Sequence, residues 1–570
     1  MRIILACFLA ITSTANAQLL IKNTTLIDVE NKKLILQQDV FIENGKISAI
    51  GKNLKSPSSQ AIDGSGKYLA PGLVDAHIHF FQSGGIYTRP DAIDLRKIRP
   101  YEEEVNWVHN NMESFLRRYT SIGVTSVIDV GANLHFLKQR DSFRTKTYAP
   151  AVYMTGPLLT TWEPNSFKNL GHDEPFFEMK TIEQAREYVN KQLPYRPDFI
   201  KIWYIVLGTN KDSSARASLP MVKAVIDEAH DKGLRVAVHA TERITAMLSV
   251  EAGADYLVHN IEDELVDDAF VNLLKSKKTV LSPTLIVANN YIKTFGQYYE
   301  ISANDLKYAH PKPLNSIIDM KGIDTNITNK YLKHIRNSVN AAAYRKEDSL
   351  LRSNLKKLSD GGVIIATGTD AGNIGTQHVS SYFDELRAMK ESGLDMWQLL
   401  QASTINGAKA VGKESEFGSI VKGKKADLIL FTKNPVENLD NWQSVDLVIN
   451  KGNLLKPDTL VHRTPEELAD QQLLAYNAHN LEAFLAPYAE DVEVYEFPNK
   501  LQTKGKAAMR KSYEFISRTP KLYCRLLNRI VEGNIVIDHE EVWGFGEKPF
   551  YGIAIYEIKN GKISKVYFPE

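Results

Sequence analysis

Hydrophobic and polar residues alternate in two separate parts of the chain. The first covers residues 18–51 and is divided by Asn-Lys, Asn-Gly and Gly-Lys turns; the second covers residues 418–431 and 444–455. Alternation with a period of two, broken by turn residues, predicts short antiparallel strands. Because the two parts look alike, we expect residues 18–70 and 408–456 to form one small β domain split by a large insertion.

The insertion, residues 71–407, alternates apolar runs with helical stretches, which is typical of a parallel α/β fold. Eight strand–helix units predict a (β/α)8 TIM barrel, with its chemistry at the carboxyl ends of the strands. The alternative is an open doubly wound sheet, although no glycine-rich phosphate loop follows the first run. The expected strands are 73–79, 124–130, 151–156, 199–204, 234–239, 254–259, 279–284 and 363–370. The long helical stretch 285–358 is a candidate lid.

The last part of the chain, residues 464–570, has its own pattern. Thr464, Pro465 and Glu467 form a helix-start signature, and strand-like runs with an Asn560-Gly561 turn follow the helix. Helices followed by antiparallel strands predict a separate α+β domain.

The N-terminus has the pattern of a secretory signal peptide. Arg2 precedes the apolar run 3–11, and the small residues 15–17 form a cleavage site, so we expect residues 1–17 to be removed near Ala17. The apolar run is too short to span a membrane. The mature protein would then be exported, to the periplasm or beyond the cell. Cleavage would leave Cys524 as its one cysteine, without an internal disulfide.

Composition changes this picture little. The 570 residues are 43% hydrophobic and 24% charged, as in soluble globular proteins, and imply more than one domain. Lys and Arg number 69 against 68 Asp and Glu. With no basic excess, we expect neither nucleic acid nor a membrane surface as a partner.

Histidines recur where the expected strands end. His77 and His79 are two residues apart, so a strand would point both rings to the same face. Alone they could equally be surface histidines, and a single strand-end histidine is more often structural. A barrel, however, brings all its strand ends together, and imidazole with carboxylate suits Zn²⁺, Mn²⁺, Fe or Co²⁺. The candidate ligands are His77, His79, Lys201, His239, His259 and Asp370.

Five motifs around these residues carry a resemblance to the amidohydrolase superfamily, in its imidazolonepropionase-like and prolidase-like branch. They are "APGLVDAHIH", "IKI", "VHA", "GADYLVH" and "TGTDAG". The resemblance covers about residues 18–455 and implies a metal-dependent hydrolase on a (β/α)8 barrel with a flanking split β-sandwich.

The resemblance also implies a role for each ligand. His77 and His79 would hold the more buried of two metal ions, and His239 and His259 the second. Asp370 would ligate metal and act as general base. The cofactors implied are two divalent ions, with Zn²⁺ preferred to Mn, Fe or Co.

Lys201 matches the family lysine that reacts with CO₂ to form a carbamate bridging both metals. Its apolar neighbours Phe199, Ile200, Ile202 and Trp203 should lower the pKa of the amine, and the neutral amine is the form that attacks CO₂.

The implied reaction is hydrolysis of a C–N amide bond by metal-bound hydroxide, with a dipeptide, cyclic amide or similar small molecule as substrate. His378 and Tyr204 are candidate substrate contacts; His378 could instead support the neighbourhood of Asp370 or simply begin a helix. The fold does not determine the substrate.

Other functions remain open. Glu242 lies three residues after His239, as in single-metal deaminases of the superfamily, although an acid at a helix start has the same pattern. A lactonase is a further possibility. The non-enzymatic alternative is an exported binding protein that is stabilised by metal.

The C-terminal domain resembles the cone-shaped fold of nuclear-transport-factor-like proteins, which includes polyketide-cyclase-like and steroid-isomerase-like members. The resemblance implies apolar ligands or pairing of domains, and we expect a homo-oligomer formed through this domain. His539, Glu540 and Glu541 could line its pocket, although strand alternation would turn some of them to solvent.

Overall fold

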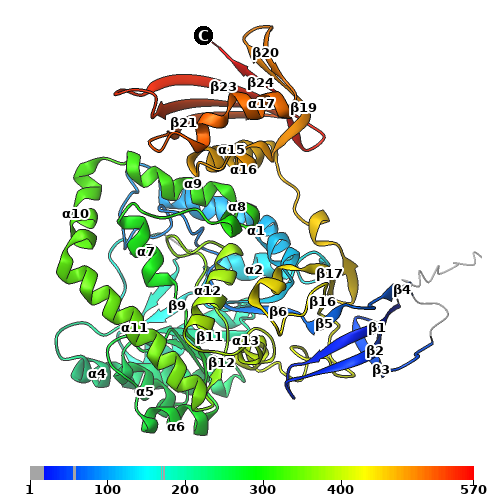
Figure 1. Cartoon of the computed structure of the whole chain (residues 1–570). Coiled ribbons are helices and arrows are strands. Elements are labelled where there is room, and N and C mark those ends of the chain that lie inside the picture. The colour runs from blue at the N-terminus through cyan, green and yellow to red at the C-terminus, as the bar shows by residue number, and fades with distance from the viewer. Residues whose placement is uncertain (1–17, 56–59, 169, 171–173, 570) are drawn as a thin grey trace, which may run out of the picture.

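The computed structural model describes residues 18–55, 60–168, 170 and 174–569, and the expected signal peptide lies outside them. Figure 1 shows a central α/β region, a small sheet beside it and a C-terminal domain above it. Among the described residues, no helix is long and apolar enough to cross a membrane.

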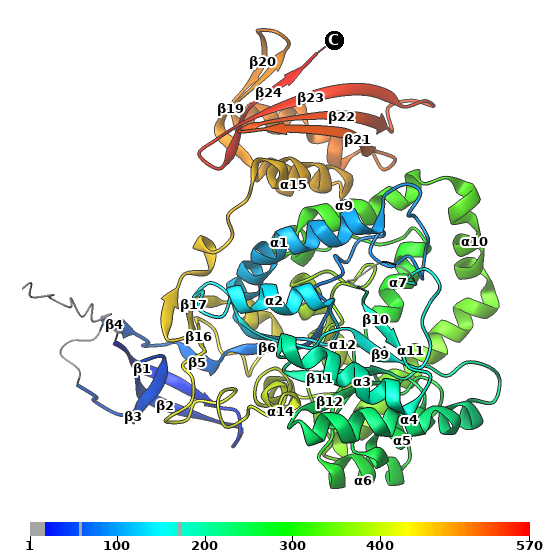
Figure 2. The ribbon, with the colours of Figure 1, turned by 180° about the vertical axis from the view of Figure 1, so that it is seen from behind.

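The small sheet contains strands from both ends of the α/β region, which lie side by side in Figures 1 and 2. Its order is β18-β17-β16-β5-β1-β2-β3, and β4 pairs with β1. The strands are β1 (Leu19–Asp28), β2 (Lys33–Glu43), β3 (Lys46–Gly51), β4 (Gln60–Asp63), β5 (Tyr68–Pro71), β16 (Leu428–Phe431), β17 (Val445–Asn450) and β18 (Asn453–Leu455). The antiparallel pair β5–β16 joins the two parts, with Pro71 opposite Leu428.

Ten strands of the α/β region form two sheets, of orders β6-β7-β8 and β10-β9-β11-β12-β13-β14-β15, and neighbouring strands are parallel. They are β6 (Leu73–Ile78), β7 (Val124–Asp129), β8 (Ala151–Met154), β9 (Leu158–Thr160), β10 (Phe176–Glu178), β11 (Phe199–Trp203), β12 (Arg235–His239), β13 (Tyr256–Val258), β14 (Val280–Ser282) and β15 (Ile364–Ile365). Every residue of β6 and β7 is buried, as expected for parallel strands covered on both faces. The expected strand positions all contain a strand, and β9 and β10 are additional.

Backbone hydrogen bonds connect the two sheets at both sides. Asp198 N, just before β11, donates to Met154 O in β8 at 2.9 Å. Ala76 N in β6 donates to Thr367 O at 2.8 Å, and Asp370 N donates to His77 O at 2.7 Å. The segment after β15 therefore lies against β6.

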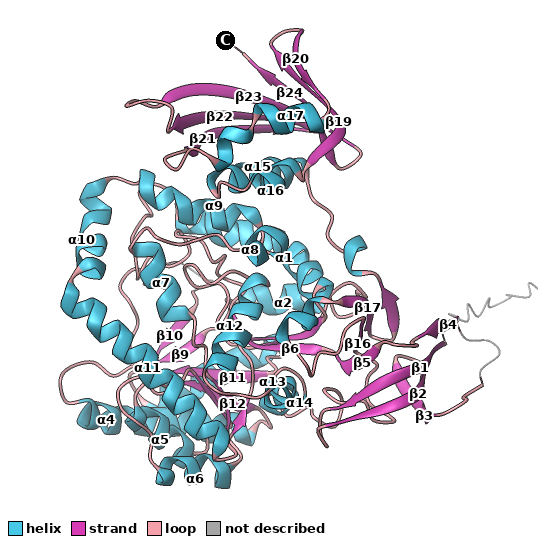
Figure 3. Cartoon of the chain, in the orientation of Figure 1, coloured by secondary structure: helices cyan, strands magenta, loops and turns pink. Residues whose placement is uncertain are grey.

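Helices surround these strands (Figure 3). They are α1 (Tyr101–Ser121), α2 (Leu134–Ser142), α3 (Ile182–Gln192), α4 (Lys211–Asp231), α5 (Arg243–Ala252), α6 (Asp268–Lys277), α12 (Ser380–Glu391), α13 (Met396–Ala402) and α14 (Ile405–Ala410), with 3₁₀ turns at Leu193–Tyr195, Leu439–Gln443 and Pro457–Thr459.

The stretch between β14 and β15 is helical, as the sequence predicts. It contains α7 (Val287–Phe295), α8 (Ala303–Tyr308), α9 (Pro311–Asp319), a 3₁₀ turn (Met320–Gly322), α10 (Thr325–Arg336) and α11 (Ser338–Asp360). In both ribbon views α10 lies at the outer edge of the molecule with α7 inside it.

The C-terminal domain has one sheet of order β20-β19-β24-β23-β22-β21 with helices on one side. Its elements are α15 (Pro465–Asn477), α16 (Leu481–Leu485), β19 (Tyr488–Glu496), β20 (Lys500–Lys504), α17 (Lys506–Ser512), a 3₁₀ turn (Glu514–Ser517), β21 (Tyr523–Glu532), β22 (Ile535–Trp543), β23 (Phe550–Lys559) and β24 (Lys562–Phe568). The predicted cap is present, because the Thr464 hydroxyl accepts from Glu467 N at 3.1 Å. Helix α15 packs against α9, where Leu474 meets Ala309 and Leu314.

Candidate metal centre and substrate cavity

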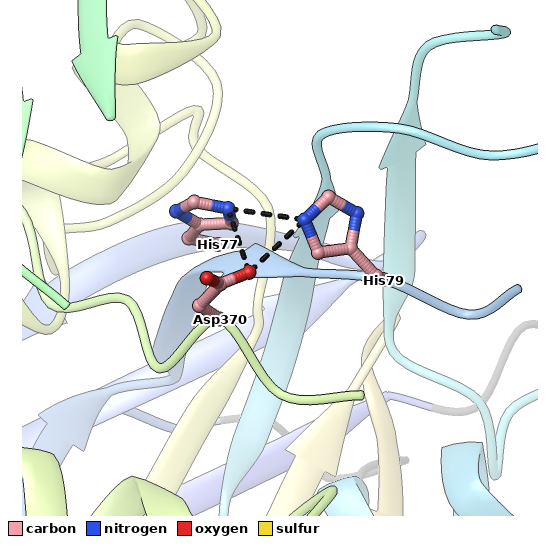
Figure 4. Close-up of side chains that lie close together, drawn as sticks. All are labelled: His77, His79 and Asp370. Atoms are coloured by element: carbon pink, nitrogen blue, oxygen red, sulfur yellow. Dashed lines mark hydrogen bonds and ion pairs between the residues drawn. The ribbon is translucent and has the colours of Figure 1, made fainter. Parts of the chain in front are cut away.

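Two histidines and one aspartate converge where β6 ends. Strand β6 carries His77, and His79 follows two residues later with its ring on the same side (Figure 4). Their Nε2 atoms are 3.3 Å apart, and Asp370 Oδ1 lies 3.1 Å from that of His77 and 3.0 Å from that of His79. The three side chains are buried and form a possible metal-binding group.

The chemistry of these donors fits a divalent metal ion. His79 Nδ1 lies 3.1 Å from Gly131 O. A carbonyl only accepts, so Nδ1 carries the proton and Nε2 presents a lone pair. Two imidazole nitrogens and a carboxylate oxygen facing one point are a donor set for Zn²⁺ and related ions.

The electrostatics favour the same donors. Burial lowers the pKa of His77 to about 4, so its ring is neutral near pH 7. Burial acts to raise the pKa of Asp370, but His77 and His79 outweigh it and hold that pKa well below its usual range. Asp370 also has a φ of +57°, and such backbone strain is concentrated at functional sites.

The other three predicted ligands, Lys201, His239 and His259, line one cavity together with His79 and Asp370. His239 ends β12 and His259 follows β13, and their ring centroids are 4.4 Å apart. The ring of His259 lies 5.0 Å from that of His77. His239 and His259 stand outside the three-donor cluster. Burial lowers the pKa of each of them well below its usual value.

Lys201, on β11, is 1% exposed. Burial lowers the pKa of its amine to about 7, against the opposing charges of Asp370 and Asp129. A substantial fraction of the amine is therefore neutral at physiological pH, as the sequence predicts from its apolar neighbours.

The cavity over these residues has a volume of about 380 Å³. Arg89 lines it and is held by Asp91 and Asn373: its Nε and Nη2 donate to the two Asp91 oxygens at 2.7 and 2.5 Å, and its Nη1 to Asn373 Oδ1 at 2.5 Å. The Tyr291 hydroxyl donates to the same Asn373 oxygen at 2.9 Å. Three of the five guanidinium N–H groups are used in these bonds.

Two buried carboxyl groups, those of Asp75 and Asp129, support the candidate metal centre, and neither was predicted from the sequence. Asp75 accepts from Thr369 N at 3.1 Å and Thr369 Oγ1 at 2.8 Å, which ties β6 to the segment carrying Asp370. Asp129 accepts from Phe80 N at 2.9 Å and Gly131 N at 3.0 Å, on either side of His79. Asp129 is the last residue of β7, and a carboxylate at the end of a parallel strand could have marked it in the sequence as a candidate residue of the site.

Tyr204 does not contact this cavity, which corrects the prediction of a substrate contact. Strand β11 ends at Trp203, and the next side chain turns into the core, where the Tyr204 hydroxyl donates to Ala215 O in α4. Trp203 lines the cavity instead.

His378 is buried behind the cavity rather than lining it, so it is not a substrate contact either. Its Nε2 lies 3.0 Å from Gln82 O, its Nδ1 lies 3.2 Å from the Tyr119 hydroxyl, and its ring stacks on Phe80. It supports the loop that follows His79.

Glu242 lies outside the cavity lining. It precedes α5, and Lys211 Nζ donates to its carboxylate at 2.9 Å. Thr241 and Glu262 line the cavity in its place, and burial raises the pKa of Glu262 to about 8.

In the C-terminal domain, alternation along β22 separates the three candidate residues. Glu540 lines an aromatic cavity of about 200 Å³, and burial raises the pKa of its carboxyl to about 8. His539 is exposed, and Glu541 pairs with Arg525 at 2.8 Å outside that cavity.

Comparisons with known proteins agree with this geometry. The profile described as "Amidohydrolase family" matches residues 68–455, and the one described as "SnoaL-like domain" matches residues 469–566. A 5-methylthioadenosine/S-adenosylhomocysteine deaminase of Thermococcus sibiricus is 25% identical over 48% of this chain and 78% of the deaminase. A dihydroorotase of Halalkalibacterium halodurans is 42% identical, over only 12% of this chain and 15% of that enzyme.

Among solved structures, a Xaa-Pro dipeptidase with bound methionine in the active site has a TM-score of 0.55 and 24% identity. The match covers 77% of this chain and all of the dipeptidase. At this identity the likeness concerns the fold. Since the family profile covers more than half of the sequence and the metal-ligand candidates lie inside it, the chain belongs to the amidohydrolase family of enzymes and carries a SnoaL-like C-terminal domain.

Proposed function

We propose that this protein is an exported binuclear metal-dependent hydrolase that cleaves a C–N amide bond in a small molecule. One observation carries the proposal: His77, His79 and Asp370 converge on one point, and His79 and Asp370 line the same cavity as Lys201, His239 and His259. We further propose that the two connected sheets are one (β/α)8 barrel, since it would bring all strand ends to one place.

The residues present divide between two ions. His77, His79 and Asp370 would hold one, His239 and His259 the other, with Zn²⁺ preferred and Mn, Fe or Co as alternatives. The Lys201 amine would attack the carbon of CO₂, forming an N–C bond and releasing one proton to water. The resulting carbamate would carry one negative charge shared by two oxygen atoms, and these oxygens would add a ligand for the ions.

Divalent ions at such a centre activate water near neutral pH and polarise a substrate carbonyl. The chain's own residues do the rest. Asp370 is ionised at neutral pH, so it can take a proton from the attacking water and deliver it to the leaving nitrogen. The guanidinium of Arg89, which lines the cavity, suits a substrate carboxylate, as in a dipeptide. Trp203 and Phe176 line the cavity and make part of its wall apolar.

A second candidate is single-metal deamination. The three-donor cluster alone holds one ion, and the deaminase from Thermococcus sibiricus aligns over 78% of its length. The position of Glu242 outside the cavity counts against it, because the expected proton carrier is then displaced. A lactonase and a metal-stabilised binding protein are further alternatives. The substrate panel described next separates them from an amide hydrolase.

The deciding experiment combines metal analysis with a substrate panel of dipeptides, cyclic amides, lactones and amino-heterocycles. We expect about two divalent ions per chain and amide hydrolysis that chelation abolishes. Asp370→Asn should retain most of the metal and lose at least about 100-fold in turnover, the lower range for a positioned acid–base group. One ion and ammonia release would favour deamination, and a metal-loaded protein inert to the whole panel would favour a binding protein.

Export and assembly are also proposals. The signal-peptide pattern of residues 1–17 supports export of the protein, with cleavage near Ala17. Assembly through the C-terminal domain is supported by apolar side chains on β22 and β23: Tyr551 is 61% exposed, Ile553 40% and Trp543 38%. Neighbouring apolar side chains exposed on a sheet are typical of surfaces that pair with another chain.

A further inference from the structure

Helix α7 contributes to the walls of two cavities. Ala288 and Tyr291 line the cavity over the metal centre, and the same residues line a second cavity of about 580 Å³ that reaches α10 and α11. The two cavities therefore adjoin at Ala288 and Tyr291, along one side of α7.

The wall of the second cavity is mainly aromatic and aliphatic. On α7, Ala288, Tyr291, Ile292 and Phe295 have the spacing of one helix face. Tyr331 of α10 meets this face, with its ring centroid 4.9 Å from that of Phe295. Ile335 and Tyr344 extend the apolar wall, while Lys330, His334 and Glu347 give it a polar margin. Apolar walls with few polar groups are typical of small-molecule sites.

Tyr291 links the two cavities chemically. Its hydroxyl donates to Asn373 Oδ1 at 2.9 Å, next to Arg89 and three residues from Asp370. Its ring lies 5.8 Å from that of Phe295, on the apolar side. A molecule held at the metal centre therefore has polar groups on one side of Tyr291 and an apolar space on the other.

We propose that this aromatic cavity between α7, α10 and α11 is the subsite for a bulky apolar group of the substrate, an aromatic ring or a branched aliphatic chain attached next to the C–N bond. The inference rests on the proposed function and narrows its substrate class. Moving such a group from water into an apolar site contributes about as much as one large buried side chain, so the expected preference in kcat/KM is about 10- to 100-fold.

The test uses matched dipeptides in the full-length, metal-loaded protein: Gly-Gly, Phe-Gly and Gly-Phe. We expect at least one aromatic member to exceed Gly-Gly in kcat/KM by about 10-fold or more. Tyr331→Ala should reduce this ratio several-fold, and Tyr331→Phe, which keeps the ring, should preserve it. Val339→Ala is the matched control, since Val339 begins the same helical region on α11 and is 73% exposed.

A binding measurement separates this inference from the proposed function. We expect metal-depleted protein to bind N-acetyl-phenylalanine at least about 10-fold more tightly than N-acetyl-glycine in calorimetry, because apolar burial does not require the metal. Hydrolysis without any aromatic preference, unchanged in Tyr331→Ala, overturns the subsite and leaves the proposed function intact. Aromatic binding lost in Tyr331→Ala, in a protein that hydrolyses no amide, overturns the proposed function and retains the subsite. Equal binding of the two compounds overturns the inference.

Discussion

His310 Nε2 and Glu467 Oε1 lie 2.7 Å apart at a buried contact between the two domains. Arg118 of α1 reaches the other carboxylate oxygen at 3.1 Å, and the Ser114 hydroxyl donates to Oε1 at 3.2 Å. Glu467 belongs to the first turn of α15, so the C-terminal domain begins with a carboxylate inserted among groups of the α/β region. The two domains are therefore joined by a buried ionic cluster as well as by apolar packing.

Glu467→Gln should destabilise the protein by about 3 kcal/mol, because it leaves the buried guanidinium of Arg118 without a counter-charge. Urea unfolding with separate probes for the two domains is the measurement. The matched control is Glu466→Gln: its partner Lys312 lies 3.3 Å away, both side chains are partly exposed, and the change should cost no more than about 1 kcal/mol. Equal effects of the two substitutions would contradict the importance of the buried cluster.

The Glu467 carboxylate should also make the free energy of unfolding depend on pH. Burial tends to raise the pKa of Glu467, but the hydrogen bond and charge of His310, with Arg118, outweigh burial and lower the pKa to about 2 from 4.5. A lowered folded pKa stabilises the protein above about pH 4.5, and this contribution is lost as pH falls towards 2. It amounts to about 3 kcal/mol. Thermal melts between pH 5 and 2 should fall more steeply in the wild type than in Glu467→Gln, and parallel curves would refute this linkage.

Lys201→Ala should lose metal and at least about 100-fold in activity, since the amine is the group that would become the bridging carbamate. Acetate or propionate added to this variant should partly restore both by supplying a carboxylate in the emptied space. Lys211→Ala, at a lysine that pairs with Glu242 near the protein surface, is the control and should keep its metal. Metal analysis by mass spectrometry, with rates on the best substrate, is the measurement. Full metal content in Lys201→Ala would exclude the bridging role.

Ile553→Arg tests assembly through the C-terminal sheet. Ile553 lies opposite His539 in the pair β22–β23, is 40% exposed and also borders the aromatic cavity of this domain, so the circular dichroism of the variant is compared with that of the wild type. If sheets of two chains pair, sedimentation velocity should show a wild-type dimer and a largely monomeric variant, because burying an unpaired charge opposes association. Val339→Arg, on exposed α11, should leave the dimer unchanged. A wild-type monomer at micromolar concentration would exclude the proposal.

Much of the candidate metal centre could be predicted from the sequence, because parallel strands bring their carboxyl ends together independently of the loops that connect them. The proximity of His77, His79 and Asp370 follows once the order of the strands is known. Tyr204 shows the limit of this reasoning. The sequence pattern predicts a strand over residues 199–204, whereas β11 ends at Trp203. Beyond Trp203 the alternation of side chains no longer holds, and Tyr204 turns into the core.

Other features depend on contacts between distant residues. Strands β9 and β10 have three residues each, too few for a period to be seen. Thr464 and Glu467 were recognisable as a helix start because capping is local. The pairing of Glu467 with Arg118 depends on how two domains meet, and no local pattern contains that information.

The pairing of β5 with β16 also sets an order of events during synthesis. Pro71 and Leu428 face each other although they are 357 positions apart in the chain. At 5–20 residues per second, β5 would wait about 20–70 s for its partner to be made. Until then the hydrogen-bonding edge of β5 that β16 later covers is open to other strands, including those of neighbouring nascent chains. A chaperone that shields β1–β5 during this interval should therefore raise the yield of folded protein more than one that acts on the C-terminal domain.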